Sequence, residues 1–478
     1  MLCRNQNQPC IRSLRVPANT RHDSRALGKM DLMSKMLRIQ LISTALLGSL
    51  VFLGCGADAD NPSSGGAEQQ IEIFSWWIQP GEADALQASL DIHKKKYPNV
   101  TVVNLTGTNA VLARSQMEQK MRNANPPDTF QANIGADLLR WVKFNGVDTS
   151  ESKLEPIGAE LSPKVFYPRL VQHASMNDVF YGVPMNIHRI NSLFFNKHVF
   201  QDLGIDEPTD NMSLDDFNQL CALIKAKGKT PISIGYAQPW VIQELVFEHI
   251  LPGIAGADYY EEFWAGNKAT SDREIAQTLQ EALLLKCGLP NQGSLCPGGY
   301  FNDTASSIDW DKALDLLQSG EAAMSPLGDW AKGYFEVNGW KADADFGVVQ
   351  FPGAHKVFIY TADSFPLPKK QGTSHTLAMQ LLQTFASIES QVAFNHVKGS
   401  IPARSDIDLS QHPDSFDSMQ QRTYAALQTA EQGLAMSGLI PSDALTTMAT
   451  TLSDSLNSGE IDTIQKYLDK NYATLSHL

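Results

Sequence analysis

The sequence predicts an α/β protein with open, mostly parallel sheets that carry helices on both faces. Three neighbouring segments support this prediction. Residues 71–77 (IEIFSWW) alternate like a strand, and residues 82–98 place apolar side chains at helical spacing until Pro98 stops the helix. Residues 100–106 (VTVVNLT) form the next expected strand. Together they predict a strand–helix–strand unit.

The same alternation continues along the chain. We expect extended segments at 127–134, 230–236 and 344–352, and a helix at 136–146. At 478 residues the chain exceeds the size at which one core usually keeps growing, so two domains are expected. Ligands of open α/β sheets bind beyond the carboxyl ends of the strands. Residues that follow strands are therefore the candidates for a site.

The first 54 residues differ from the rest of the chain. They carry eight Lys or Arg against two Asp, followed by an apolar run of 16 residues, 39–54. This order predicts an export signal, since the run is shorter than the ~18–20 residues that span a bilayer. A transmembrane anchor is the alternative. The region is longer than such signals need, so a translation start at Met30 or soon after stays open.

Composition and charge narrow the function classes. Hydrophobic residues make up 43% and charged residues 19%, as in ordinary globular proteins. The formal charge is −14, and it becomes −20 once the eight basic and two acidic residues of 1–54 are removed. Such an acidic surface repels phosphate backbones, so nucleic acid is excluded as a partner.

The cysteines indicate no metal site. Beyond the export segment and Cys55, only Cys221, Cys287 and Cys296 remain, and no CxxC or HExxH spacing occurs. Outside the cytoplasm a Cys287–Cys296 disulfide is plausible. Cys221 could instead compete for Cys287 or stay buried and free. We expect no metal and no cofactor.

Seven segments between residues 69 and 442 carry a resemblance to a known family. Taken together and in their order along the chain, these segments make the protein similar to the sugar-binding lipoproteins of ABC importers. The similarity is greatest to the glucose/mannose-type proteins of the maltose-binding-like group. The segments are IEIFSWW, HKKKYPNVTV, PPDTFQANIG, YGVPMNIHRINSLFFNKHVF, GEAAMSPLGDWAKGYF, ADSFPLPK and FNHVKGSIPAR.

This resemblance implies a two-lobed periplasmic-binding-protein fold (type II), with mixed sheets flanked by helices and the ligand cleft between the lobes. The N-terminal lobe is expected at 69–185 plus 324–395 and the C-terminal lobe at 186–323 plus 396–478. The segment FLGC resembles a lipobox, which makes Cys55 the lipidated residue and 55–68 a flexible tether. The protein would then be a monomer anchored by lipid in the periplasm or at the cell surface.

A sugar presents hydroxyl groups at its edge and weakly apolar faces, so its site needs flat aromatic surfaces and fixed polar groups. Trp76 and Trp77 are adjacent at the end of the first expected strand. Neighbouring strand residues point to opposite faces. We therefore expect Trp77 to line the cleft and Trp76 to pack inside the first lobe.

The expected polar contacts follow other strands. Gln131 and Asn133 lie two apart and so share a side of an extended segment. Glu82, Asp329 and Lys398 are further expected sugar contacts. Glu82 and Asp329 could instead cap helices, and Lys398 could instead be a solvated loop cation. Arg189 is expected at the surface in an ion pair. The family resemblance adds the remaining sugar-binding candidates, namely His188, Trp240, Trp330 and Asp363.

The expected function is the binding of a monosaccharide or small oligosaccharide, with glucose, mannose and galactose as candidates, and its delivery to the permease subunits of an ABC importer. Two alternatives stay open. The protein could sense sugar without transporting it. It could also be a secreted glycosidase in which Glu82 and Asp363 act as a carboxylate pair, although no sequence motif supports catalysis.

Overall fold

The computed structural model describes residues 69–107, 110–142, 152–288, 299–370 and 374–475, which belong to one compact unit, Gly66–Leu478. The predicted export signal, Cys55 and the tether lie outside these residues. Within the described ranges, no helix combines the length and apolar character needed to cross a membrane.

The first strand–helix–strand unit is confirmed. Strand β1 (Gln69–Phe74) pairs in parallel with β2 (Val100–Asn104), and helix α2 (Glu82–Lys96) connects them. Gly81 is the N-cap of helix α2, and its backbone N–H donates to the Asp84 carboxylate at 3.1 Å. Acidic residues in the first turn and lysines in the last turn complement the helix dipole.

The first lobe is built around a hydrophobic core that includes Ile71, Phe130, Phe365 and Phe394. Its parallel sheet has the order β2-β1-β3, and a second sheet joins β4, β15 and β5, with β8 also paired to β15. Further elements of this lobe are α3 (Ala110–Arg122), β3 (Thr129–Phe130), β4 (Ala132–Asn133), α4 (Ala136–Leu139), β5 (Leu154–Glu155), α5 (Pro168–His173), β6 (Ser175–Met176), β7 (Val179–Phe180), β8 (Gly182–Pro184), β15 (Asp363–Pro368), α13 (Ser374–Phe385) and α14 (Ile388–Lys398).

The second lobe has its own core, which includes Phe194, Phe247, Trp264 and Phe335. Its sheet has the order β11-β12-β10-β13, in which β11 and β12 are parallel while β10 runs antiparallel to both its neighbours. The elements are β10 (Ser192–Asn196), α6 (Lys197–Leu203), α7 (Leu214–Ala226), β11 (Thr230–Ile232), α8 (Trp240–Gln243), α9 (Leu251–Trp264), α10 (Arg273–Cys287), α11 (Trp310–Gln318), β12 (Ala322–Pro326), α12 (Trp330–Val337), β13 (Phe346–Gln350), α16 (Met436–Leu439), α17 (Ser442–Ser458) and α18 (Ile461–Leu475).

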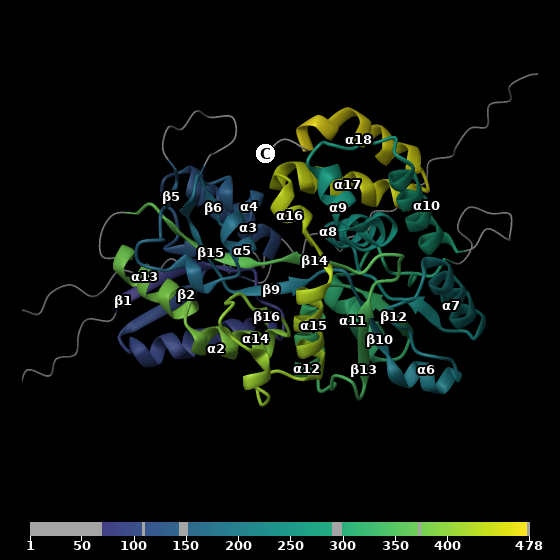
Figure 1. The fold of residues 1–478 in the computed structure, drawn as a ribbon, viewed down its shortest axis with the longest axis horizontal. Coiled ribbons are helices and arrows are strands. Elements are labelled where there is room, and N and C mark those ends of the chain that lie inside the picture. The colour runs from purple at the N-terminus through teal and green to yellow at the C-terminus, as the bar shows by residue number, and fades with distance from the viewer. Residues whose placement is uncertain (1–68, 108–109, 143–151, 289–298, 371–373, 476–478) are drawn as a thin grey trace, which may run out of the picture. The chain divides into compact units, whose positions relative to one another are not determined.

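A small sheet connects the lobes, with the order β16-β9-β14-β17. Along β9 (Asn186–Arg189) the chain leaves the first core after Ile187 and joins the second core at Ile190. Strand β14 (Val357–Thr361) returns, with Ile359 in the second core and its neighbours Phe358 and Tyr360 in the first. Both strands run between the lobes near the centre of Figure 1.

The third crossing follows β17 (Glu431–Leu434), because Leu434 packs in the first core and Ala435 in the second. The remaining connecting elements are β16 (Ile401–Pro402) and α15 (Ser418–Thr429). The three crossing segments are hydrogen-bonded neighbours, so any rotation of one lobe against the other must bend them together.

The expected lobe boundaries differ from this packing in two segments. Residues 324–351 belong to the second core, because β12 and β13 pair with β10. Most of the buried residues in 401–434 belong to the first core instead, since β16 and β17 extend the connecting sheet. We therefore place the second and third crossings at 357–362 and 434–435.

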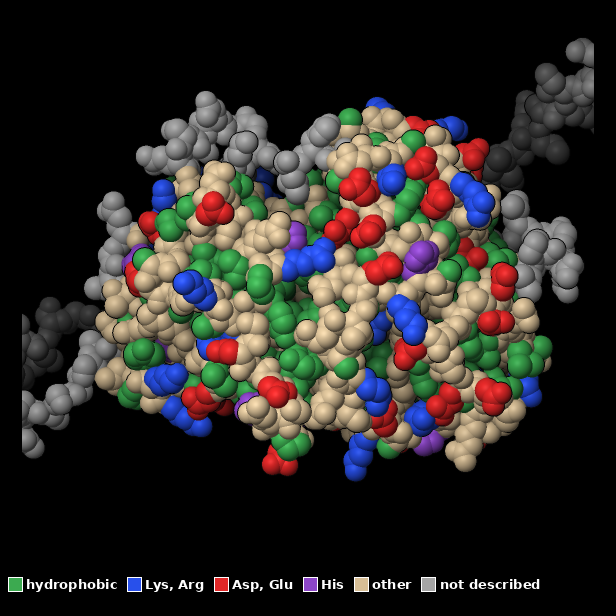
Figure 2. Space-filling view, viewed as in Figure 1, with side chains coloured by type: hydrophobic (Ala, Val, Ile, Leu, Met, Phe, Trp, Pro, Cys, Tyr) green, Lys and Arg blue, Asp and Glu red, His purple; other side chains and the backbone are tan. Residues whose placement is uncertain are grey.

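Surface charge is mixed on the face shown in Figure 2. Lys and Arg side chains lie among Asp and Glu side chains there and do not gather into one basic surface.

Two of the three candidate cysteines are described. Cys221 is buried and free. Cys287, at the end of α10, is disulfide-bonded. Its expected partner Cys296 lies outside the described residues, and so the pairing itself stays a prediction.

Two carboxylates lie together beside the second lobe's core, Glu248 buried and Glu244 partly buried. Glu244 and Glu248 lie one turn apart in a π-helical segment, Glu244–Ile250, and the Glu248 carboxylate accepts a hydrogen bond from the backbone N–H of Met436 at 2.6 Å. Burial raises the pKa of Glu248 to about 7, although the Met436 hydrogen bond acts against it. Burial and the neighbouring Glu248 charge raise the pKa of Glu244 well above its ordinary value.

We expect Glu248→Gln to flatten the pH dependence of stability. The folded pKa of Glu248, about 7, lies above its ordinary value of 4.5, so its contribution is complete below pH 4.5 and is lost as pH rises through 7. The wild type should lose ~2 kcal/mol of unfolding free energy between pH 5 and pH 8 through this group. Urea denaturation at both pH values measures it, with the exposed Glu262→Gln as control. Equal losses in wild type and Glu248→Gln would contradict the assignment.

Candidate functional site

Polar side chains converge where the two lobes meet the connecting sheet. The Gln131 side chain, directly after β3, donates to Asp363 Oδ1 at 2.7 Å. Asn186, at the start of β9, donates from Nδ2 to Asp363 Oδ2 at 2.9 Å and accepts from the Asp363 backbone N–H at 2.8 Å. The carboxylate of Asp363 is thus held at both oxygens in a site that is almost fully buried.

This chain of hydrogen bonds extends to the end of β1. The side-chain oxygen of Gln131 accepts from Ser75 Oγ at 2.7 Å and from the Trp76 backbone N–H at 3.1 Å. The position of Trp76 is therefore coupled to that of Asp363 through one amide side chain.

His188 joins this chain to the second lobe. Its Nδ1 hydrogen-bonds the Asp329 carboxylate, while its Nε2 lies 2.9 Å from Asn186 Nδ2 and 3.5 Å from Asp363 Oδ2. Burial alone would lower the pKa of His188, but the Asp329 charge and the hydrogen bonds to Asp329 and Asp363 outweigh it and raise that pKa. Burial disfavours the Asp363 carboxylate, yet the hydrogen bonds and charge of His188 bring the pKa of Asp363 below its ordinary value.

The Asp329 side chain hydrogen-bonds residues of the polar cluster and does not cap its own helix. Asp329 stands at the N-cap position of α12, but its side chain makes no capping hydrogen bond. Its carboxylate accepts from His188 and from the backbone N–H of Arg189, the latter at 2.9 Å. The capping alternative is therefore wrong for Asp329.

Lys398 and Glu82 form a buried ion pair. Lys398 Nζ lies 2.7 Å from Glu82 Oε1, and the two side chains are 2% and 13% exposed. Lys398 is therefore no solvated loop cation. Its charge is close enough to act against protonation of His188. The cap of α2 comes from Asp84, which leaves Glu82 committed to Lys398.

Two tryptophans of the second lobe stand beside this polar cluster. The Trp330 ring meets the His188 ring edge-on at 5.3 Å, and the Trp240 ring lies 6.1 Å from Trp330. Both are partly buried, so part of each indole stays accessible. These faces suit the apolar side of a small polar ligand.

The two tryptophans pack differently from the expectation. Trp77 is 2% exposed and packs against Phe394 and Phe365 in the first core, with ring centroids 4.6 and 5.7 Å away. Trp76 is the partly exposed ring, with the Arg114 guanidinium 4.8 Å from its centroid. It also borders a cavity of about 10 Å³, room for about one water, beside Gln131. Trp77 therefore packs in the first core of this structure, and its contact with a ligand stays a prediction.

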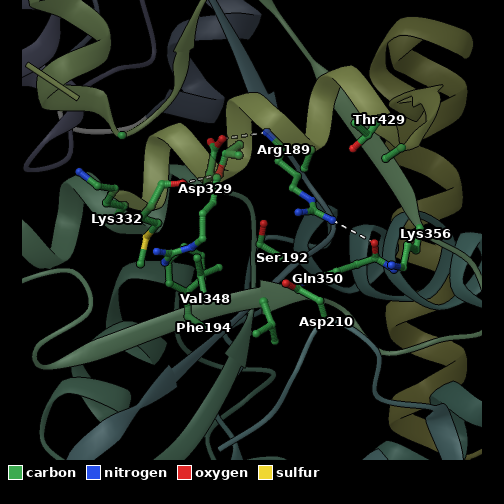
Figure 3. A pocket seen from close by; sticks show the side chains of 17 residues that line it. Arg189, Ser192, Phe194, Asp210, Asp329, Lys332, Val348, Gln350, Lys356 and Thr429 are labelled. Atoms are coloured by element: carbon green, nitrogen blue, oxygen red, sulfur yellow. Dashed lines mark hydrogen bonds between the residues drawn. The ribbon is translucent and has the colours of Figure 1, made fainter. Parts of the chain in front are cut away.

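Two other expectations meet a different geometry. Arg189 is not in a surface ion pair, because its guanidinium donates to the neutral acceptors Gln350 Oε1 and Val357 O at 3.1 and 3.2 Å. It lines a cavity that Asp329 also borders (Figure 3). Asn133 stays beside the site, since it pairs with Asp363 across β4 and β15 and is partly exposed.

Sequence reasoning missed Asn186 and Trp76. Asn186 and His188 are two apart on one strand, the same spacing that selected Gln131 and Asn133, so this signal was present in the sequence. The described residues contain no group of three or more His, Cys, Asp or Glu placed to hold a metal ion.

Comparison with known proteins agrees with this fold. The sequence pattern of bacterial extracellular solute-binding proteins matches residues 67–391. An ABC transporter extracellular-binding protein of Pyrococcus horikoshii is 32% identical over 410 residues, which cover 84% of this chain and 87% of that one. A "probable sugar-binding periplasmic protein" of Brucella suis is 27% identical over 404 residues, which cover 83% and 87% of the two chains.

Among solved structures, a chitin oligosaccharide binding protein superposes with a TM-score of 0.71 at 18% identity, covering 85% of this chain and all of that one. Such solved neighbours are two-lobed periplasmic binding proteins, and the same fold is present here.

We expect Trp77→Ala and Trp76→Ala to differ in their effect on stability. Trp77→Ala empties a buried position and should cost ~3–5 kcal/mol of unfolding free energy. Trp76→Ala should cost less than ~1 kcal/mol because its ring is partly exposed. Chemical denaturation of both variants measures these values. A larger loss for Trp76→Ala than for Trp77→Ala would refute the placement of the two rings.

The Asp329 carboxylate should hold the pKa of His188 above its ordinary value of 6.5. Protonation of His188 therefore stabilises the fold fully below pH 6.5, and this contribution disappears as pH rises through the raised folded pKa. In Asp329→Asn, burial would dominate and the imidazole should titrate below the wild-type midpoint. NMR titration of the imidazole resonance measures both proteins, and an unchanged midpoint would argue against the pair.

Proposed function

The chain belongs to the family of bacterial extracellular solute-binding proteins, and from this premise we propose that it binds a sugar between its lobes and hands it to the permease of an ABC importer. The observation that carries the proposal is the chain of polar groups from Gln131 through Asp363 and His188 to Asp329, which joins both lobes and the connecting sheet. The sugar-binding and oligosaccharide-binding names of relatives support the ligand class.

The chemistry of the cluster suits a polyhydroxylated ligand. Carboxylates accept from hydroxyl groups, whereas Lys398 and the Gln131 amide donate to them. In the structure these groups satisfy one another, with Gln131 bonded to Asp363 and Lys398 to Glu82. A sugar that enters must therefore replace internal hydrogen bonds with equivalent ones, and an epimer that leaves one group unpaired loses affinity.

The lobes also provide a mechanism for enclosure. They touch where Gly81 meets Gly333 and where Gly135 meets Gly438, with so little space that an added Cβ would lie 2.6 and 2.2 Å from the opposing backbone. A ligand that contacts both lobes stabilises this arrangement over one in which they separate. Closure would then be the signal that a permease recognises.

We propose glucose, mannose or galactose as the ligand, and lipid anchoring through Cys55 at a membrane surface with the protein acting as a monomer. Anchoring keeps the captured sugar beside the importer at raised local concentration. A sensing role without transport would use the same site.

A glycosidase is disfavoured by the carboxylates themselves. Glu82 is held by Lys398 at 2.7 Å, and His188 keeps the pKa of Asp363 below its ordinary value against the effect of burial. Asp363 is therefore not placed to donate a proton at neutral pH, as a general acid must.

Lys398→Ala should weaken sugar binding at least tenfold, because it removes a buried donor and leaves the Glu82 carboxylate unpaired. A thermal-shift screen with glucose, galactose, mannose and common disaccharides first identifies the ligand by its stabilisation of the folded state. Calorimetry then compares the variants. Lys370→Ala is a matched control, since it breaks another lysine–carboxylate pair in the first lobe, with Asp128 at 2.8 Å. Equal affinity in wild type and Lys398→Ala would remove the site assignment.

A further inference from the structure

A cavity lies beside strand β9, next to the polar cluster, and its lining includes both Arg189 and Asp329. It has a volume of about 250 Å³. His188 and Arg189 are successive residues of one strand and so point to opposite faces, His188 toward Asp363 and Arg189 into this cavity (Figure 3). The cavity and the polar cluster thus lie next to each other at β9 and share Asp329 at their border.

The charge inside this cavity is only partly balanced. Arg189 donates to the neutral oxygens of Gln350 and Val357, and burial lowers its pKa to about 10, which leaves it protonated at neutral pH. Across the described ranges, no carboxylate oxygen lies within ion-pair distance of its guanidinium, and Lys356 likewise has no ion pair there. Two cations therefore face the cavity without a direct partner.

The other charged groups of the wall are already engaged. Lys332 pairs with Glu336 at 2.7 Å and with Asp417 at 3.0 Å. Arg422 pairs with Asp343 at 2.7 Å, and the Asp329 carboxylate is bound by His188. Asp210 accepts from the Gln350 backbone N–H at 2.7 Å and is the remaining acidic group of the lining. Among the lining residues, Arg189 and Lys356 are thus the cations without a direct carboxylate partner, while Asp210 and Asp329 act on the Arg189 charge from a greater distance.

The uncharged lining completes the chemistry. Ser192, Thr423 and Thr429 offer hydroxyl groups, while Phe194 and Met419 supply apolar surface. This combination matches a small organic molecule with one carboxylate, some hydroxyl groups and a short carbon chain. The volume is that of a metabolite-sized ligand rather than a peptide.

The walls come from both sides of the hinge. Ser192 and Val348 lie on β10 and β13 of the second lobe, whereas Gly399 follows α14 of the first lobe. Rotation about the connecting sheet must change the distance between these walls. A molecule that fits the cavity when the lobes touch therefore binds that arrangement more tightly than a separated one.

We propose that this cavity is a second ligand site, which takes a small organic carboxylate against Arg189 and Lys356 and raises the affinity of the sugar site by holding the lobes together. Binding of the carboxylate goes beyond the proposed function. Its coupling to sugar rests on that function, and linkage requires the two affinities to change by the same factor.

The direct test titrates the purified protein with lactate, pyruvate, succinate and gluconate, using calorimetry and thermal shift. Phosphate and chloride at matched ionic strength serve as comparison anions. At least one carboxylate should give saturable binding that the comparison anions do not reproduce. Absence of binding by every carboxylate, or an equal response to chloride, would overturn the proposal.

Variants locate the binding. Lys356→Gln should weaken the carboxylate at least fivefold, and Ala426→Phe, whose side chain would fill the cavity from α15, should abolish it. Ala425→Phe is the matched control on the exposed side of the same helix. Lys356 is exposed, so its substitution should leave the fold and sugar affinity unchanged without the carboxylate. Equal carboxylate affinity in wild type, Lys356→Gln and Ala426→Phe would also overturn the site.

Coupling is measured separately, with the sugar identified by the thermal-shift screen. Saturating carboxylate should raise sugar affinity severalfold in wild type and not in Ala426→Phe, and saturating sugar should raise carboxylate affinity by the same factor. Carboxylate binding without this change would overturn the coupling. A failure to find any sugar ligand would count against the proposed function alone, since the carboxylate titration requires no sugar.

Discussion

The buried hydrogen bond between His188 and Asp329 is the interaction on which the arrangement of this protein depends. His188 lies on the strand that carries the chain out of the first lobe, and Asp329 begins a helix of the second lobe. The same imidazole lies 3.5 Å from Asp363, which Gln131 and Asn186 hold from the first lobe and the connecting sheet. One side chain therefore relates the polar groups of both lobes to each other.

Burial requires the polar groups of this cluster to find hydrogen-bond partners within the protein. A charged or polar group removed from water must find partners within the protein, and each of the groups in the cluster does so. The consequence is that the lobes have a preferred relative position even without a ligand. A ligand then has to compete with internal hydrogen bonds, which makes selectivity a matter of how many of these bonds it can replace.

The sequence predicted the parts of the fold that depend on local periodicity. The β1-α2-β2 unit was expected because alternating and helical patterns are set by the chain itself. The predicted packing of the tryptophan pair differs from the structure because β1 ends at Phe74, so strand alternation no longer applies at Trp76 and Trp77. The backbone position there depends on side chains distant in the sequence, since the Gln131 side chain accepts from the Trp76 N–H. Such long-range bonds cannot be read from a local pattern.

The predicted lobe boundaries differ from the observed packing for a related reason. Residues 324–351 contain ordinary strand and helix patterns, and only their pairing with β10 assigns them to the second lobe. Because β9, β14 and β17 are adjacent in one sheet, the three crossings form a single mechanical element. His188 and Arg189 are neighbours on β9, so the polar cluster and the Arg189 cavity are both built on this one crossing strand. Two chemically different spaces on the two faces of that strand must share the same hinge.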